Sequence, residues 1–436
     1  MTIEQILERA RKVAQEAEVY YTEYQDTPVG FESNRLKHVQ SRQGTGVSLR
    51  IIKDGRIGFA ATTRLDQIDE LVQAALEIAQ FGAEAKFRMP PSPKNVYRVD
   101  VYDPDVETIP IERMVTMGTA MIDIVQQHTP DIQCECSVDK RTGSSRIINS
   151  NGLDVSYKRS SFSVSIEGTF IRDTDMLFVG DRAASCKADI DVEELARNTV
   201  EQLELAKEIA PAPVGEQPAM FTPRAVLSSL LYPLIVALNG RNVLQGSSPL
   251  GMLLGEKVLT DEFTLWDDPT RPYIPGSHSW DDEGVPAQKR ALIERGILRG
   301  FLYDLQTAGL AGTTSTGNAS RTASSLPSPS MSVAVIDGGS KSRDELMRSV
   351  KEGVVIDELI GAGQGNILGG DFGGNLLLGY RIQDGRIVGR VKNTMVAGNV
   401  YEALKDAEFS KDTEWVSGFL HTPYILCSKV SISSKE

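Results

Sequence analysis

Four short segments of the chain place a tight-turn sequence between two apolar runs. They are residues 51–57 (IIKDGRI), 148–153 (INSNGL), 292–298 (LIERGIL) and 382–387 (IQDGRI). Asp-Gly and Asn-Gly supply the positive φ angles of hairpin turns, so these segments predict antiparallel strand pairs. Strict alternation of strands and helices is missing between them. The pattern therefore favours an α+β fold over a doubly wound parallel sheet.

A proline-rich stretch, residues 210–218 (APAPVGEQP), divides the chain near its middle. With 436 residues, the chain also exceeds what one hydrophobic core normally serves. We expect a mixed α/β N-terminal lobe over residues 1–210, which could divide into subdomains 1–105 and 106–210. A linker at 211–218 and a strand-rich C-terminal domain over 219–436 complete the expected organisation.

Charge and hydropathy exclude several classes of function. The formal net charge is −13 and no run of basic residues occurs, which disfavours direct nucleic-acid binding. The most apolar run, Leu230 to Leu238, is far shorter than a membrane span and is interrupted by Tyr232 and Pro233. The first residues predict an amphipathic helix and not the apolar core of a signal peptide. We expect a cytoplasmic protein without a membrane partner.

The four cysteines, 134, 136, 186 and 427, show no C-x-x-C spacing, so we interpret them as reduced packing thiols. Glycine-rich residues 361–366 (GAGQGN) fail the dinucleotide fingerprint at their sixth position. No G-x-S-x-G nucleophile elbow occurs either. These patterns alone identify no catalytic constellation.

Two carboxylate clusters stand out, Asp267 with Asp268 and the run from Asp281 to Glu283. In a glycine-flanked loop such carboxylates could bind Mg²⁺ or Ca²⁺, although solvated turn residues are the commoner explanation. The chain has four histidines, none of them in an H-E-x-x-H pair. Their isolation argues against a self-contained zinc hydrolase, in which two histidines one helical turn apart share the ion.

An ordered series of motifs resembles the TldD/PmbA family along nearly the whole chain. The motifs are residues 55–59 (GRIGF), 151–152 (NG), 267–269 (DDP), 281–284 (DDEG), 315–319 (STGNA), 370–372 (GDF) and 394–399 (TMVAGN). The resemblance implies an N-terminal α/β lobe and a strand-rich C-terminal lobe. It also implies a two-component protease built from a TldD-like and a TldE (PmbA)-like subunit. The family carries an older label as a modulator of DNA gyrase.

In the TldD-like member, the resemblance implies a helix with a His-Glu-x-x-x-His motif ahead of the acidic loop. Here that helix should fall between Thr222 and Gly240, yet residues 218–255 contain no His, Glu, Asp or Cys. Leu231, Tyr232 and Val236 stand about where the metal ligands would be, so we expect these side chains to pack against neighbours. The chain thus resembles the TldE (PmbA) branch.

That branch implies a noncatalytic subunit that binds unfolded peptide, while zinc belongs to a TldD-like partner. We therefore assign no catalytic residue, metal ligand or cofactor to this chain. The alternative is a stand-alone homodimer that binds or modulates a polypeptide without protease activity. Candidate substrate-groove residues come from the acidic loop, the 315–321 segment and the glycine-rich 369–374 segment. They are Asp281, Asp282, Glu283, Thr316, Gly317, Asn318, Arg321, Gly370 and Asp371.

Overall fold

Two β-sheets divide the chain in the computed structural model, which describes residues 2–94, 96–173 and 175–434. The first sheet is antiparallel, in the order β4-β3-β1-β5-β6-β7, with β2 paired to β1. Its strands are β1 (Glu16–Glu32), β2 (Arg35–Val39), β3 (Arg42–Lys53), β4 (Arg56–Thr62), β5 (Gln133–Asn149), β6 (Asp154–Arg172) and β7 (Asp175–Ser185). Strand β1 pairs with β5, so one sheet contains residues from before and after position 105, the boundary between the two expected subdomains.

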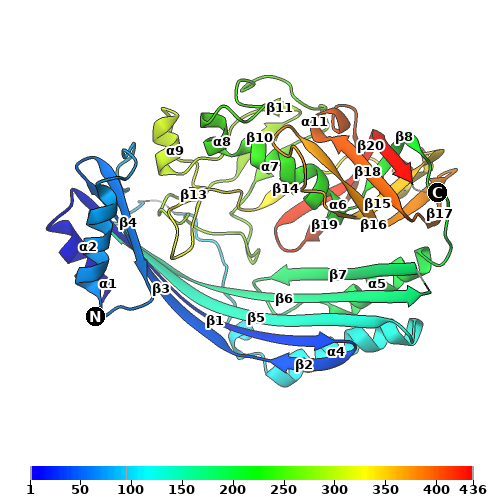
Figure 1. Cartoon of the computed structure of the whole chain (residues 1–436), viewed down its shortest axis with the longest axis horizontal. Helices are drawn as coiled ribbons and strands as arrows, with labels where there is room; N and C mark the ends of the chain where they lie inside the picture. The colour runs from blue at the N-terminus through cyan, green and yellow to red at the C-terminus, as the bar shows by residue number, and fades with distance from the viewer. Residues whose placement is uncertain (1, 95, 174, 435–436) are drawn as a thin grey trace.

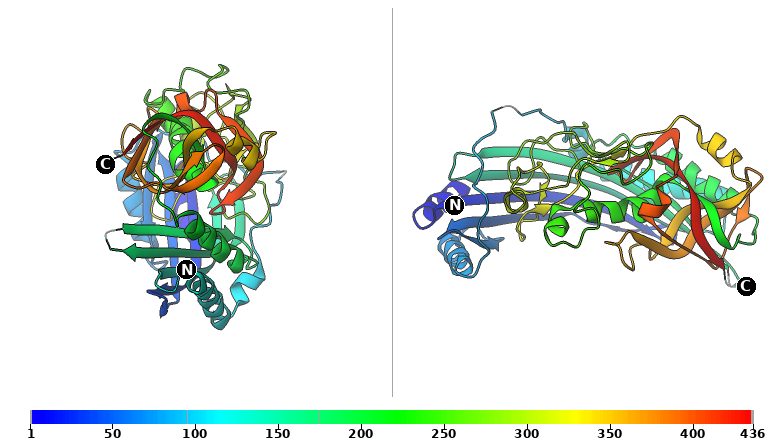
Figure 2. Two further views of the ribbon diagram at one scale, coloured as in Figure 1. Left: turned by 90° about the vertical axis from the view of Figure 1, so that its right-hand side faces the viewer. Right: turned by 90° about the horizontal axis from the view of Figure 1, so that it is seen from above.

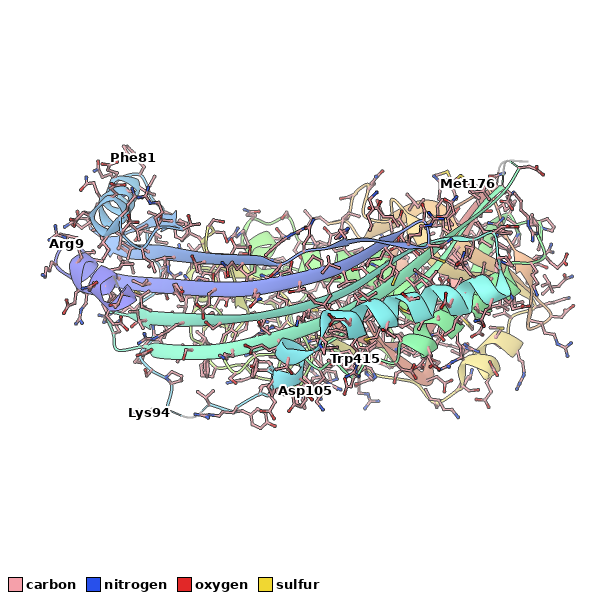
Figure 3. All side chains as sticks on the ribbon, turned by 90° about the horizontal axis from the view of Figure 1, so that it is seen from below. Arg9, Phe81, Lys94, Asp105, Met176 and Trp415 are labelled. Atoms are coloured by element: carbon pink, nitrogen blue, oxygen red, sulfur yellow. The ribbon has the colours of Figure 1, made fainter. Side chains whose placement is uncertain are left out.

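This long sheet curves beneath the C-terminal part of the chain, as Figure 1 shows, and Figure 2 gives its extent from two further sides. Helices α1 (Ile3–Arg11) and α2 (Ile68–Ala79) cover one end of the sheet. Helices α3 (Pro104–Thr108), α4 (Ile111–His128) and α5 (Val192–Leu205) pack at the other end. Figure 3 shows α4 lying over the sheet and running roughly along its strands, with Arg9 and Phe81 far away at the opposite end.

Each end of the sheet has its own apolar core. Ile6 of α1 and Val72 of α2 pack with Leu49 in one cluster. Met114 and Met121 of α4 are fully buried in the other, where methionine side chains fill the core. Helices therefore pack against both ends of the sheet, and the middle of the sheet faces the C-terminal domain.

The second sheet forms the C-terminal domain. Its strands are β8 (Gly215–Phe221), β9 (Leu265–Asp267), β10 (Arg290–Glu294), β11 (Ile297–Leu298), β14 (Ala334–Ile336), β15 (Glu352–Ile360), β16 (Asp371–Gln383), β17 (Arg386–Arg390), β18 (Thr394–Asn399), β19 (Glu408–Val416) and β20 (Leu420–Ser434). Strand β8 pairs with both β15 and β20, so β20, β18, β16, β15 and β8 close into a ring. Residues 215–218 of the proline-rich stretch are thus part of a strand. Pro218 lies where the register with β20 shifts, a position that tolerates a missing N–H.

Short helices and a small two-stranded sheet fill the connections of this domain. They are α6 (Pro223–Ala225), the π-helix η1 (Val226–Leu231), α7 (Tyr232–Leu238), α8 (Gly240–Leu244), α9 (Leu305–Leu310), α10 (Arg343–Arg348), α11 (Val400–Ala403), β12 (Ala319–Ser320) and β13 (Ser328–Pro329). The run α6-η1-α7 buries Leu230, Leu234 and Leu238 in the C-terminal core.

All four predicted hairpins are present, as β3–β4, β5–β6, β10–β11 and β16–β17. In the first, Asp54 and Gly55 have φ angles of 51° and 74°, which matches the positive values that a tight hairpin turn requires. The expected α+β class with two lobes is confirmed.

Helix α5 joins the two lobes. Leu195 and Leu203 share a core cluster with Val355 and Tyr380 of the second sheet. The Tyr380 hydroxyl also donates to the Gln202 carbonyl at 3.3 Å. All four cysteines are buried and unpaired. Within the described residues, no helix is long and apolar enough to cross a membrane.

Candidate functional site

A cleft lies between the open middle of the first sheet and loops of the C-terminal domain. Its larger part is a cavity of about 810 Å³. The residues that line it are Tyr20, Thr22, Glu23, Tyr24, Thr45, Gly46, Ala61, Thr62, Thr63, Arg141, Gly143, Ser144, Ser145, Tyr157, Arg159, Ser160, Ser161, Arg321, Thr322, Ala323 and Ser324. Hydroxyl groups, three tyrosine rings and three guanidinium groups therefore dominate this surface.

Strand alternation builds the floor of this cavity. Tyr20, Thr22 and Tyr24 lie two apart on β1 and so point to one face of the sheet. Val19 points to the opposite face, where it joins the core under α1 and α2. Loop residues 321–324 lie over the strands, so close that a Cβ on Gly46 would meet the Ala323 Cβ at 2.4 Å.

The smaller part of the cleft is a cavity of about 340 Å³. It shares Tyr20, Tyr157, Arg159 and Arg321 with the larger cavity, so the two are continuous. Its other lining residues are Gly276, His278, Trp280, Asp281, Asp282, Asn318, Ala319, Ser320, Ser330, Met331 and Ser332.

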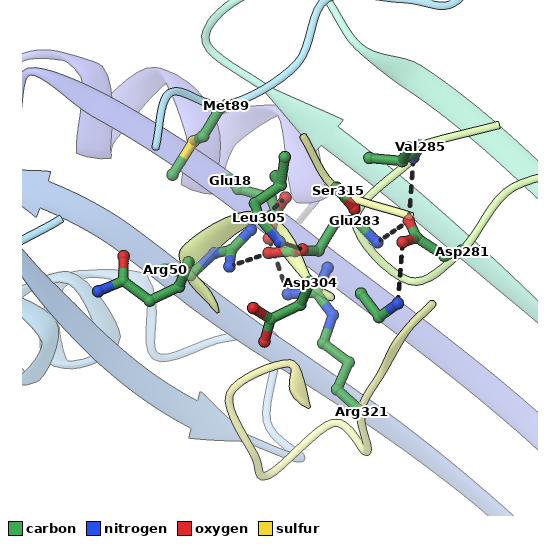
Figure 4. Close-up of polar contacts among 12 residues, drawn as sticks. Glu18, Arg50, Met89, Asp281, Glu283, Val285, Asp304, Leu305, Ser315 and Arg321 are labelled. Carbon is green, nitrogen blue, oxygen red and sulfur yellow. Dashed lines mark hydrogen bonds and ion pairs between the residues drawn. The ribbon is translucent and has the colours of Figure 1, made fainter. Parts of the chain in front are cut away.

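Four buried charged side chains connect the two lobes behind the cleft, as Figure 4 shows. Glu18 Oε1 accepts from Arg321 Nη1 at 2.7 Å, and Glu18 Oε2 accepts from Arg50 Nη2 at 3.1 Å. Arg50 Nη1 donates to Glu283 Oε1 at 2.5 Å. All four side chains are at most 3% exposed. Burial raises the pKa of Glu18, but Arg321 and Arg50 outweigh it and hold that pKa below its ordinary value.

The acidic loop is buried, so its interpretation as solvated turn carboxylates is wrong. Asp281 Oδ1 accepts from the backbone N–H groups of Glu283 and Val285, and Oδ2 accepts from that of Ala319, each at 2.9 Å (Figure 4). Asp282 Oδ2 accepts from the Arg321 N–H at 2.9 Å. These carboxylates hold the loop against the 318–321 segment.

The first carboxylate cluster organises a neighbouring loop. Asp267 Oδ1 accepts from the N–H groups of Ser332 at 2.8 Å and Val333 at 3.0 Å, while Oδ2 accepts from Asn318 Nδ2 at 2.5 Å. Asp268 pairs with Arg271 at 3.1 Å. Both clusters therefore accept hydrogen bonds from groups of the protein itself.

Burial shifts the pKa values of several side chains in and beside the cleft. It raises the pKa of Asp267 to about 6, and it also raises the pKa of Asp281 and Asp282. The same desolvation lowers the pKa of His278 to about 4, with a further contribution from Arg159. His278 is thus a neutral side chain at pH 7.

The donor sets do not form the metal site that the resemblance implies for a TldD-like member. Among the described residues, no group of three or more His, Cys, Asp or Glu side chains could hold a metal ion. Leu231 is fully buried in the C-terminal core, as expected. Tyr232 is 46% exposed and Val236 is half-buried, so neither side chain is fully buried in this core. Burial raises the pKa of the Cys427 thiol, which leaves it without thiolate character.

The structure brings together some of the predicted groove residues and separates others. Asp281, Asp282, Asn318 and Arg321 line the smaller cavity. Glu283 lies behind it, paired with Arg50.

Two further groove candidates lie beside the cleft, and one pair lies elsewhere. Thr316 Oγ1 accepts from the Tyr303 N–H at 2.8 Å, and the Gly317 carbonyl lies 3.5 Å from His278 Nε2. Gly370 and Asp371 line neither cavity; Asp371 starts β16 and accepts from Asn399 Nδ2 at 2.9 Å.

Sequence reasoning missed the contribution of the first sheet to the cleft. Tyr20, Tyr157, Arg141 and Arg159 come from three strands that carry none of the predicted groove residues. The alternation of Tyr20, Thr22 and Tyr24 is a detectable local signal, but it does not say what lies opposite. The arrangement as a whole offers binding through hydroxyl, aromatic and guanidinium groups.

Comparisons with known proteins agree with this architecture. Three family models match: PmbA/TldA metallopeptidase domain 1 at residues 17–79, its central domain at 104–207 and its C-terminal domain at 214–434. A metalloprotease of Methanothermobacter thermautotrophicus is 29% identical over 86% of this chain and 84% of its own length. The metalloprotease PmbA homolog of Haemophilus influenzae is 25% identical, over 98% and 94%.

Among solved structures, TldE from Thermococcus kodakarensis superposes with a TM-score of 0.89 and 26% identity. The match covers 99% of this chain and all of that one. The fold, the order of the three matched domains and the full-length similarity agree, and the chain belongs to the PmbA/TldD metallopeptidase family.

Proposed function

We propose that this chain is the noncatalytic, TldE/PmbA-like subunit of a cytoplasmic two-component metallopeptidase that processes or degrades unfolded peptides. A TldD-like partner carries the zinc in this proposal. One observation carries it: the helical run from Pro223 to Leu238 has no metal-binding side chain, and Leu231 in its middle is core.

A metallopeptidase needs about three protein ligands around its catalytic ion. The described part of this chain offers no such group, and in the acidic loop both oxygens of Asp281 already accept from backbone N–H groups. Supplying the missing ligands would require several substitutions on a helical run whose Leu231 is packed in the core. A partner chain that already holds the metal removes this requirement.

The cleft supports a role in peptide binding. It is elongated by the continuity of its two cavities, and hydroxyl groups and backbone loops line it. Such a surface can hydrogen-bond an extended chain without selecting one sequence strongly. Four buried, unpaired cysteines are consistent with a reducing compartment, which supports the cytoplasmic assignment.

The test compares three preparations: this chain alone, a TldD-like partner alone and the two together. Zinc per chain is measured by mass spectrometry, and cleavage of an unfolded peptide is followed over time. We expect cleavage to require the partner and zinc to follow the partner. Stoichiometric zinc together with cleavage by this chain alone would overturn the proposal.

The same preparations distinguish the proposed complex with a TldD-like partner from the homodimer alternative. Light scattering after size exclusion gives the mass of each complex, and native co-purification identifies its members. A stable homodimer that never associates with a TldD-like chain would replace the proposal with a stand-alone binding protein.

A further inference from the structure

The larger cavity is cationic, although the chain as a whole has a net charge of −13. Its lining contains Arg141, Arg159 and Arg321 and one carboxylate, Glu23. Glu23 is engaged within the protein, since it accepts from the Tyr21 hydroxyl at 3.1 Å and from Ser144 Oγ at 2.9 Å. A local excess of guanidinium groups in an acidic protein indicates selection for a ligand of opposite charge.

Two of these arginines have no carboxylate partner. Within the described residues, neither Arg141 nor Arg159 has an acidic oxygen within ion-pair distance. Arg159 donates instead to the carbonyl oxygens of Pro275 and Ser277, the latter at 2.7 Å. Two acids lie in the neighbourhood. Asp26 is the cross-strand partner of Arg141 on β1, and Asp282 lines the smaller cavity with Arg159, where burial raises its pKa.

The third arginine is paired, yet it still has unused donors. Arg321 Nη1 donates to Glu18, while its Nε and Nη2 have no hydrogen-bond partner among the described residues. Its side chain is only 1% exposed. Buried donors without acceptors are costly, and an incoming oxygen would satisfy them.

Each guanidinium group is held by a tyrosine ring. Arg321 lies 4.2 Å from the centroid of Tyr20, Arg141 lies 4.5 Å from that of Tyr24, and Arg159 lies 5.4 Å from that of Tyr157. Stacking orients the planar group and lowers the entropy lost when it binds a carboxylate. Three such pairs from β1, β5, β6 and one loop therefore form a preorganised surface.

We infer that this cavity binds the carboxylates of an extended acidic peptide, so that acidic segments are the preferred substrates; the inference rests on the proposed function. A volume of about 810 Å³, continuous with a second cavity, exceeds what a single small anion fills. The hydroxyl groups around the arginines form hydrogen bonds with the peptide backbone between its acidic side chains.

The test uses calorimetric titration of the full chain with a flexible peptide of Gly, Ser and Glu, and with its isosteric Gln version. Each peptide is made with a free and with an amidated carboxyl terminus. We expect the Glu peptide to bind more tightly, and the preference to shrink as ionic strength rises. Amidation separates a contribution of the terminal carboxylate from that of the side chains.

Arg141→Gln is the informative variant, because Arg141 is exposed and has no structural ion pair. It should weaken binding of the Glu peptide by about fivefold and leave the Gln peptide unchanged. Arg172→Gln is the matched control, since Arg172 is also exposed and also stacks on a ring, that of Phe170 at 4.7 Å, outside the cleft.

Equal binding of the Glu and Gln peptides would overturn the preference for acidic segments and leave the proposed function standing. An unchanged preference in Arg141→Gln would overturn the assignment to this cavity. If neither peptide binds, the peptide-binding role itself fails. Arg321→Lys provides a second reading at the buried position, because it keeps the charge and removes the unpaired Nε and Nη2 donors.

Discussion

Arg321 reaches Glu18 across the junction of the two lobes, with Nη1 2.7 Å from Oε1, although 303 positions separate the two residues in the chain. Glu18 belongs to the middle of the first sheet, and Arg321 belongs to the loop that covers the cleft. One buried ion pair therefore fixes the loop on the sheet and sets the position of a cleft residue.

Replacing Glu18 should destabilise the protein strongly. Glu18→Gln leaves Arg321 and Arg50 buried with one compensating charge fewer, and we expect the free energy of unfolding to fall by about 3 kcal/mol. Urea denaturation followed by tryptophan fluorescence measures it. Glu23→Gln on the same strand is the control, because Glu23 is exposed, and it should change stability by less than about 0.5 kcal/mol. Equal effects of the two variants would contradict this account.

Asp267 should make the protein less stable as pH rises. Its pKa is about 6 in the folded protein against 3.8 as the ordinary value, so between these values the folded state holds a proton that the unfolded state has lost. The wild type should therefore lose about 1.4 kcal/mol per pH unit relative to Asp267→Asn from pH 4 to pH 6. Denaturation of both proteins across this range measures the difference. A difference between the two proteins that stays flat across this range would refute the prediction.

His278 should have the opposite effect from Asp267 and make the protein more stable as the pH rises over a similar range. Burial lowers its pKa to about 4 from 6.5, so the unfolded state binds the extra proton in this window and stability rises with pH. The ring-proton resonances of His278, assigned by their loss in His278→Gln, should stay at their neutral positions until the pH falls close to 4. Titration near pH 6.5 would show that the side chain is solvated and that the smaller cavity is open.

Neighbouring positions on one helical run should respond very differently to truncation. Leu231→Ala removes a fully buried side chain and should cost about 2–5 kcal/mol of unfolding free energy. Tyr232→Ala removes a side chain that is 46% exposed and should cost clearly less. Thermal and urea denaturation of both variants provide the comparison. If Leu231→Ala lowers the free energy of unfolding less than Tyr232→Ala does, this face of the helix is not part of the core.

Local patterns predicted much of the secondary structure. Asp54 and Gly55 set their hairpin because a tight turn depends on the φ angles of two adjacent residues. Likewise, Ser342 caps α10 through its hydrogen bond from the Glu345 N–H, as the sequence Ser-x-x-Glu predicts. Such features involve residues within one turn of each other, so no distant part of the chain is needed to specify them.

The candidate site was only partly predictable. Asp281, Asn318 and Arg321 were identified through motifs of the C-terminal domain, and these residues do line one cavity. Tyr157 and Arg159 lie on the opposite wall, on a strand whose sequence shows only alternation. Alternation tells which residues share a face, but the partner of that face depends on how the two lobes dock.

The sequence by itself determined the hairpins, the absence of metal-binding side chains from residues 218–255 and the kinship to one family. The tertiary structure alone decided that the acidic loop is buried, that Glu18 lies between two arginines and that strands of the first sheet form the floor of the cleft. The reason is physical: the charge state and accessibility of a side chain depend on everything around it. Glu18 is an example, because one of its two arginine partners, Arg321, lies 303 positions away in the chain.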